Sequence, residues 1–417
     1  MKITNRLHLQ ERPCAPAINE THWQRAAIAV ALGSAMMAGA SLPAHAQESN
    51  NSSSSKTPGK LGLQIETGLD LLYDDNVFRV DDRVEKPADD IIVTPSVQLT
   101  YAHPVGRHDV LVRAKAGYDW FVSHNERSKL RLDGEARANI RFGATCVLTP
   151  SAAYRQQRAD YGDINQNTEN LQRFTTLGAD LSCERPGLFP VAGYEHAMTR
   201  NADRFDYADQ TSDSVYAGVG YNKPSLGTIT ATYEHTSSDR DNLGITNRID
   251  AYALRFQRSV SPLTQIDAQV AWLDVKGGSD VVGDYDGLGW DVKLTSAFVP
   301  RLKLAVSTKR DIVNDSLIAS GFAIRSNYRV EGYYALSELT SIGLYADWER
   351  RKFRQDAALR PFNITADKNR RFGATVKRKL TDRADLALDA QHYRRRTDTS
   401  SSNYSGTQVT LSALLRF

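Results

Sequence analysis

The chain has 417 residues, and its 52 lysines and arginines nearly balance its 49 aspartates and glutamates, for a formal net charge of +3. A balance of this kind excludes the strong positive field expected of a nucleic-acid-binding protein. Mean hydropathy is low, at -0.46. After the first 46 residues, no stretch approaches the roughly 18 apolar residues that a membrane-spanning helix needs.

The N-terminal segment has the pattern of a secretion signal. Residues 1–25 are basic, residues 26–42 are apolar and rich in small side chains, and Ala44-His45-Ala46 gives the A-x-A pattern of a cleavage site. We therefore predict a signal peptide over residues 1–46, with a retained helical anchor as the alternative. Residues 47–60 are rich in serine and asparagine, which predicts a disordered periplasmic leader.

From residue 61 onward, apolar and polar side chains alternate in runs of about ten residues, the length with which a tilted strand crosses a bilayer. In the run over residues 130–142, one face is apolar and the other is charged. The apolar face holds Leu130, Leu132, Gly134, Ala136, Ala138, Ile140 and Phe142, and the opposite face holds Arg131, Asp133, Glu135, Arg137, Asn139 and Arg141. A soluble β-sandwich also alternates, but its strands are about five or six residues long.

Aromatic residues fall near the ends of these runs, as in the girdles at the two membrane interfaces. They are Tyr73, Tyr101, Trp120, Tyr194, Tyr221, Tyr233, Trp272, Phe298, Trp348 and Phe372. Short connections also alternate with longer polar ones. The pattern predicts an all-β fold over residues 61–417, a transmembrane antiparallel up-and-down β-barrel of about 18 strands in the Gram-negative outer membrane. One miscounted hairpin would make the number sixteen.

The C-terminal residues form a candidate assembly signal. Apolar side chains occupy every second position and end on an aromatic carboxy-terminus: Val409, Leu411, Ala413, Leu415 and Phe417. The pattern resembles the signal by which outer-membrane barrels reach the barrel-assembly machinery, which we therefore expect to be a partner.

An acidic motif, Tyr73-Asp74-Asp75-Asn76-Val77-Phe78-Arg79, opens the first long connection. Dense carboxylates could hold calcium, but the D-x-D-x-D-G spacing is absent, and side-chain to backbone hydrogen bonds that tighten the loop are the favoured role. The motif resembles the start of bacterial barrels of the β-barrel porin-2 family, including the EpsL-type proteins associated with exopolysaccharide. The resemblance implies an 18-stranded barrel and a link to polysaccharide export, and it transfers no catalytic residue.

Charged residues on the predicted inward face would line a water-filled lumen. They are Arg113, Lys115, Arg131, Glu135, Arg137, Lys293, Arg325, Arg329, Glu331, Asp347 and Arg351. Aromatic residues on the same face, Phe121, Tyr216, Tyr345 and Tyr393, could stack on sugars or serve in packing.

Three basic clusters fall where strands meet long connections, at Arg350-Arg351-Lys352, Arg370-Arg371 and Arg394-Arg395-Arg396. Guanidinium groups there could bind lipopolysaccharide phosphates, and Arg350, Arg371 and Arg395 represent this hypothesis. A solvated rim is the alternative.

Cys146 begins one predicted strand and Cys183 ends the next. Antiparallel neighbours bring both cysteines to the periplasmic end, at a separation that a disulfide can bridge. Two unrelated thiols remain the alternative if the strands are offset by two or three residues.

No histidine is spaced to pair with a serine nucleophile or an acidic dyad on one strand, and no CxxC or His/Cys cluster suggests a metal. We therefore expect no enzyme activity, no metal and no cofactor. The favoured function is a channel that passes exopolysaccharide or other hydrophilic solutes. The alternative is a non-conducting barrel whose outer loops bind a partner or matrix. Outer-membrane lipid and lipopolysaccharide are the expected partners, polysaccharide is the expected cargo, and nucleic acid is excluded.

Overall fold

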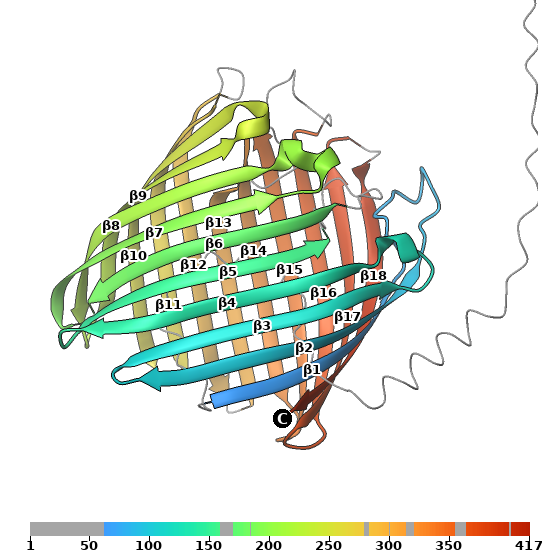
Figure 1. Cartoon of the computed structure of the whole chain (residues 1–417), viewed down its shortest axis with the longest axis horizontal. Coiled ribbons are helices and arrows are strands. Elements are labelled where there is room, and N and C mark those ends of the chain that lie inside the picture. Colours follow the sequence, from blue (N-terminus) through green and yellow to red (C-terminus); the bar gives the residue numbers. More distant parts are fainter. Residues whose placement is uncertain are drawn as a thin grey trace, which may run out of the picture. The chain divides into compact units, whose positions relative to one another are not determined.

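The computed structural model describes residues 62–158, 170–183, 185–278, 283–299, 301–313, 321–354, 364–399 and 402–417. The predicted signal peptide and leader lie outside the described residues. The described chain forms eighteen long strands (Figure 1). These are β1 (Gly62–Asp74), β2 (Asp90–Val105), β3 (His108–Phe121), β4 (Lys129–Phe142), β5 (Cys146–Arg158), β6 (Leu171–Cys183), β7 (Gly187–Arg200), β8 (Gln210–Lys223), β9 (Gly227–Arg240), β10 (Ile245–Ser261), β11 (Thr264–Lys276), β12 (Tyr285–Val299), β13 (Leu302–Val313), β14 (Phe322–Ala335), β15 (Thr340–Arg354), β16 (Ala366–Lys379), β17 (Ala384–Thr397) and β18 (Tyr404–Arg416).

Each strand pairs antiparallel with its neighbours in the sequence, and β1 also pairs with β18. The closing pairing runs from Glu66 opposite Arg416 to Asp74 opposite Gln408. Closure leaves the sheet without a free edge strand, which is the condition for crossing a bilayer with strands. The predicted all-β barrel of 18 antiparallel strands is confirmed.

The outer surface of the barrel is apolar. Side chains that alternate with the charged ones, such as Leu130, Leu254, Val270 and Leu344, are 45 to 63% exposed. Seven of the predicted girdle aromatics are also exposed: Tyr73, Tyr101, Tyr194, Tyr221, Tyr233, Trp272 and Phe372. An apolar belt between aromatic girdles on a closed barrel is the architecture of the Gram-negative outer membrane, which this chain spans.

The connections differ in length at the two ends. Those after even-numbered strands have two to four residues, whereas those after odd-numbered strands have four to fifteen. Short 3₁₀ helices lie in three of the longer ones: η1 (Asn125–Arg127), η2 (Asp203–Ala208) and η3 (Asp241–Leu243). In Figure 1, η1 and η2 lie at the end of the barrel away from the C-terminus. Among the described residues, no helix is both long and apolar enough to cross a membrane.

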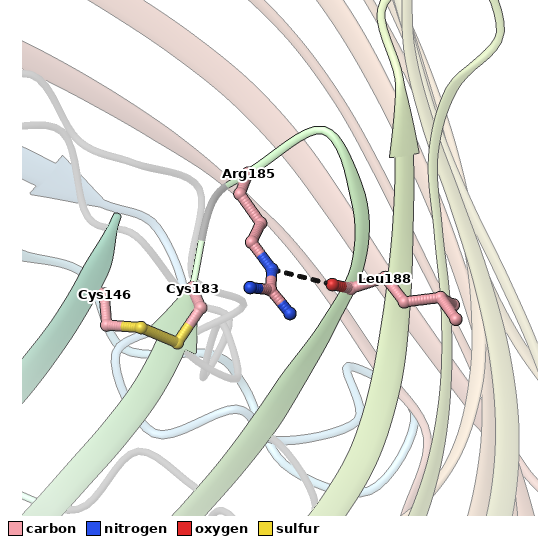
Figure 2. Close-up of a disulfide and its surroundings, with 4 residues drawn as sticks. All are labelled: Cys146, Cys183, Arg185 and Leu188. Atoms are coloured by element: carbon pink, nitrogen blue, oxygen red, sulfur yellow. Dashed lines mark hydrogen bonds between the residues drawn. A yellow bond between two sulfur atoms is a disulfide. The ribbon is translucent and has the colours of Figure 1, made fainter. Parts of the chain in front are cut away.

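A disulfide joins Cys146 and Cys183 at the end with the short connections (Figure 2). The two residues are directly opposite in the register of β5 and β6, and their Cα atoms lie 3.9 Å apart. The strands therefore have no offset, which was the condition for the bond. In the following turn, the Arg185 Nε atom donates a hydrogen bond of 2.8 Å to the Leu188 carbonyl oxygen.

Candidate functional site

The inner wall of the barrel is the candidate functional site, and the charged residues expected there lie on it. All of them occupy positions opposite in phase to the exposed apolar belt, and many pair with an acid or base on the adjacent strand. Arg113 bonds Glu135 at 3.2 Å, and Arg325 bonds Asp311 at 2.6 Å. The register also places Lys293 opposite Asp267 and Arg329 opposite Asp347. Paired charges of both signs give a wall that can hold water.

One arc of the wall, formed by β6 to β9, is acidic. It carries Asp180, Glu195 and Glu234 on neighbouring inward positions. The Tyr216 hydroxyl donates to Asp180 Oδ1 at 2.7 Å, and the Ser214 hydroxyl donates to Glu234 Oε1 at 2.9 Å. In these four strands, all of them described, the single basic residue at an inward position is Arg240, at the outer end of β9. The middle of this arc therefore has a negative surface rich in hydroxyl groups.

The opposite arc carries charge of both signs. On the inward positions of β15 to β17, five bases are balanced by five acids: Arg351, Arg371, Lys377, Lys379 and Arg395, with Asp347, Glu349, Asp367, Asp385 and Asp389. In a closed ring of eighteen strands, β15 to β17 lie nine places from β6 to β8 and so face them across the lumen. Arg371 and Lys377 lie on inward positions of β16. Neither makes an ion pair with a described residue. An acidic arc that faces an arc of balanced charge sets up a field across the lumen, and low-dielectric walls strengthen such fields.

Five inward aromatic rings lie flat against the wall because each has a glycine directly opposite on the next strand. A Cβ atom added to Gly193 would lie 2.3 Å from the Tyr216 ring, and one added to Gly373 would lie 2.2 Å from the Tyr345 ring. Five pairs share this arrangement: Phe189 and Gly220, Tyr216 and Gly193, Tyr333 and Gly343, Tyr345 and Gly373, and Tyr393 and Gly406. Rings of this kind cover exposed glycine backbone and fix the register.

The four aromatics considered as sugar platforms therefore divide into two groups. Phe121 and Tyr393 are 1% and 8% exposed, so their rings are occupied by packing. Tyr216 and Tyr345 are only partly buried and lie on opposite arcs. Sugar stacking remains a prediction for this second pair alone.

The sheet opens at its outer end between β12 and β13. Their pairing ends at Trp290 opposite Arg310, while the outer residues of β12, Tyr285 to Gly289, pair only with β11 among the described strands. Beyond this point lie Ile312, Phe322 and Ile324. They continue the alternation of residues that face lipid nearer the periplasmic end of β13 and β14. They instead pack against Ile249, Val275 and Tyr285 on the inner side of β10 to β12.

The ends of β13 and β14 therefore fold into the barrel mouth, and we call residues 311–313 and 322–324 the inward hairpin. Phe322 is fully buried, and the Asn247 amide donates to the Gly321 carbonyl oxygen at 3.2 Å. The other side of the inward hairpin, through Ala323 and Val313, packs on Phe353, Ile364 and η2. A hydrophobic cluster thus extends from the wall into the mouth and narrows it.

The Tyr-Asp-Asp-Asn motif is tied to the barrel wall by hydrogen bonds. The Asp74 carboxylate accepts a hydrogen bond from the Asn76 backbone at 3.0 Å, and the Asn76 side chain bonds the Val80 and Ser405 carbonyl oxygens at 2.8 and 2.9 Å. These contacts are the structural role expected for the motif. No cluster of three metal-ligating side chains occurs in the described part of the chain.

Arg79 holds the motif to the wall from a left-handed backbone conformation, with φ of 55°. Its guanidinium bonds Asp74 at 2.7 Å, hydrogen bonds the Tyr393 hydroxyl, and lies 4.4 Å from the centre of the Tyr393 ring. These three contacts offset the strain of a left-handed arginine. The chain from Tyr73 to Arg79 is therefore fixed against β17 and β18.

The structure corrects two of the three arginines proposed for the lipopolysaccharide rim. Arg395 is 1% exposed, and its guanidinium bonds the fully buried Asp367 at 2.9 Å. Arg371 pairs in register with Asp347 and Tyr393 and points inward with them. The strands keep their two-residue period to their outer ends, so neighbours in each basic cluster alternate between the two sides. Of the three, only Arg350 faces outward.

Sequence reasoning missed two outward polar groups. His196 and Tyr194 both bond Asp213 on the next strand, at 2.8 and 2.6 Å. His235 and Tyr233 bond Asp250 in the same way, at 2.9 and 2.5 Å. The repeated tripeptide Tyr-Glu-His, at 194–196 and 233–235, was the available signal.

The candidate assembly signal lies on β18, the strand that closes the barrel. Val409, Leu411 and Ala413 face outward opposite Tyr73, Leu71 and Leu69 of β1. The Phe417 backbone donates to the Ile65 carbonyl oxygen at 2.9 Å, while the Phe417 side chain is 69% exposed. Recognition by the assembly machinery stays a prediction.

No protein-family model matches the chain, and no curated protein matches its sequence. Solved structures of Pseudomonas outer-membrane porins are similar to it in outline. OpdK from Pseudomonas aeruginosa is 12% identical, with 86% of this chain and 100% of that one covered and a TM-score of 0.48. A BenF-like porin from Pseudomonas fluorescens Pf-5 is 10% identical, with 85% and 99% covered and a TM-score of 0.48. These values are too low to transfer a substrate to this chain.

Proposed function

We propose that this protein is an outer-membrane channel for small hydrophilic solutes, and that the field across its lumen selects them by charge. The observation that carries the proposal is the inner wall, where an acidic arc with Glu195 faces an arc of balanced charge that includes Arg371 and Lys377. Polar solutes and ions can exchange their hydration for such a wall, as in water-filled barrels.

The exopolysaccharide expected from the family resemblance is the alternative cargo. The inward hairpin narrows the outer mouth, which favours small solutes over a polymer chain. The partly exposed Tyr216 and Tyr345 are the feature that suits a saccharide. A non-conducting barrel remains the rival from a different class, and conductance separates it from both cargoes.

The test is single-channel recording of the refolded protein in planar bilayers under a potassium chloride gradient. The wild-type protein should conduct. Arg371→Gln with Lys377→Gln should move the reversal potential toward cation selectivity, and Glu195→Gln with Glu234→Gln should move it the opposite way. Arg378→Gln, a neutralisation on the outward face of the same β16, is the matched control and should leave it unchanged. A silent wild-type barrel would favour the non-conducting class.

A second measurement addresses the narrowed mouth. Phe322→Ala with Asn247→Ala removes the packing and the hydrogen bond that hold the inward hairpin to the wall. Conductance should rise, whereas Phe372→Ala on the outward girdle should leave it unchanged. Liposome-swelling rates with monosaccharides and longer oligosaccharides then measure the size limit. Equal rates for both would favour the polymer cargo.

A further inference from the structure

Seven basic side chains gather on the lipid-facing side of the barrel at the outer ends of three adjacent strands. We call them the basic strip: Arg350, Lys352 and Arg354 on β15, Lys368 and Arg370 on β16, and Arg394 and Arg396 on β17. All seven are exposed, while the residues between them, such as Phe353, Asp367 and Arg395, are buried. The strip is therefore a feature of one face and is separate from the lumen.

The strip places like charges directly opposite one another. Arg350, Lys368 and Arg396 form one row across the three strands, and Trp348, Arg370 and Arg394 form the row below. Like charges at directly opposite positions destabilise a sheet. None of the seven makes an ion pair with a residue that the structure describes. The arrangement therefore calls for an anion from outside the chain.

The next carboxylate along this face does not neutralise the strip. Asp398 follows Arg396 by two positions, at the outermost edge. Its Oδ2 atom accepts a hydrogen bond of 2.8 Å from the Thr365 backbone and another from the Thr365 hydroxyl. That carboxylate is therefore engaged in joining two outer connections.

Aromatic side chains fix the depth of the strip. Trp348 and Phe372 pack edge to face with ring centroids 5.6 Å apart, and Phe372 is 45% exposed on the lipid-facing surface. Tryptophan and aromatic girdles mark the boundary between hydrocarbon and headgroups. The basic strip begins beside this pair and extends outward, so it lies at the depth of headgroup phosphates.

The same level elsewhere on the barrel has the opposite charge. Asp250, Asp274 and Asp286 lie directly opposite one another on the outward faces of β10 to β12. Two cations lie beside them, Lys276, which bonds Asp274 at 3.1 Å, and Arg248, which is directly opposite Lys276. Arg173 and Arg200 also face each other on the outward sides of β6 and β7, but the largest group of outward positive charges among the described residues at this rim is the one on β15 to β17.

We infer that the basic strip binds the phosphate groups of a phosphorylated glycolipid of the outer leaflet, the lipid A part of lipopolysaccharide. Arginine guanidinium binds phosphate with two parallel hydrogen bonds, and five of the seven residues are arginines. Acyl chains below the phosphates would lie against the apolar belt. A soluble anion or an anionic polymer would lack the contact of acyl chains with the apolar belt. We therefore infer that the ligand of the strip is a lipid.

The experiment is titration of the refolded full-length barrel in a non-ionic detergent with bisphosphorylated lipid A, read by native mass spectrometry. Arg350→Gln, Lys368→Gln and Arg396→Gln together neutralise the central row. The matched control, Arg248→Gln, Arg258→Gln and Arg378→Gln, removes the same charge from outward positions outside the strip. Heat-modifiable gel mobility verifies that each variant is folded.

The central-row variant should bind lipid A at least about tenfold more weakly than wild type, since three charge-assisted contacts are lost. The control should bind as wild type does, and dephosphorylated lipid A should bind wild type as weakly as lipid A binds the central-row variant. Equal lipid A affinity in wild type and the central-row variant would overturn the inference. So would equal affinity of wild type for pyrophosphate or for an anionic polysaccharide, because neither carries acyl chains.

Discussion

The two ends of the barrel are stabilised in different ways. At the periplasmic end, turns of two to four residues join the strands, and glycines with positive φ, such as Gly106 and Gly143, form tight corners. One disulfide adds a covalent link there. At the outer end the connections have up to fifteen residues. Their described parts and the adjoining strand ends are fixed by buried ion pairs, side-chain to backbone bonds and the hydrophobic cluster of the inward hairpin.

Loop-closure entropy accounts for the difference. A short turn costs little entropy to close, so its backbone geometry is sufficient, whereas a longer connection costs more and gains order only through side-chain contacts. The outer end, whose loops cost more entropy to close, is also the end with the candidate constriction. Changes at the outer end should therefore affect stability and permeation together, and changes at the periplasmic end should affect stability alone.

The largest effect is expected at the buried ion-pair network of the outer end. Asp367→Asn leaves Arg351 and Arg395 without their shared carboxylate, and we expect a loss of about 3–5 kcal/mol in unfolding free energy. The measurement is a urea titration of the refolded barrel in micelles. Asp382→Asn at the periplasmic end is the control. Its carboxylate is 95% exposed beside Lys379, so the loss should stay below about 1 kcal/mol. Similar losses for both variants would remove the contrast between the ends.

The disulfide tests the comparison at the periplasmic end, where a change should affect stability but not permeation. Cys146→Ser with Cys183→Ser opens a covalent loop of 37 residues, and the chain-entropy model gives a loss of about 3–4 kcal/mol. Channel conductance should not change, because the bond lies away from the outer mouth. Reduction of the wild-type protein should lower stability by the same amount and leave the double variant unaffected. Alkylation of free thiols at both positions in native protein would show that the bond is not formed.

In the wall between the two ends, the loss of unfolding free energy on substitution should depend on whether the residue faces lipid or the lumen. Ala136 faces lipid on β4, and Ala136→Arg should cost about 2–4 kcal/mol near the midplane. Arg137 faces the lumen, and Arg137→Ala should cost less than about 1 kcal/mol, since its contact with Glu135 is 3.9 Å long and partly exposed. The same unfolding titration compares them. A reversed order would mean that the register is shifted by one residue.

The smallest effect is a pH dependence of the first outer connection. Hydrogen bonds from Arg83 lower the pKa of Asp81 from 3.8 to about 2. A lowered pKa in the folded state stabilises the loop at pH values above the ordinary pKa, and this contribution is lost as pH falls from about 4 to about 2. Hydrogen exchange of residues 82–88 should therefore accelerate over that range. Arg83→Gln should abolish the acceleration, whereas Lys86→Gln should preserve it.

The sequence by itself determined the class of fold, because a period of two over ten or more residues has one stable solution in a bilayer. The strand at residues 130–142 shows this directly, since its faces in the structure are those of its pattern. The sequence also favoured the pairing of Cys146 with Cys183, because consecutive strands of a barrel must be neighbours and both cysteines flank short turns. The register of β5 and β6 in the structure decided between the disulfide and two unrelated thiols.

The tertiary structure decided the side on which each residue of the basic clusters lies, since three consecutive arginines carry no period of their own. It also decided the inward hairpin. Ile312, Phe322 and Ile324 continue the lipid-facing pattern of their strands, and only the opening between β12 and β13 turns them toward Val275. Likewise, the field across the lumen depends on which strands face each other nine places apart around the ring. That relation exists only once β1 pairs with β18, because a linear pattern of alternation specifies the face of a residue but not what lies across from it.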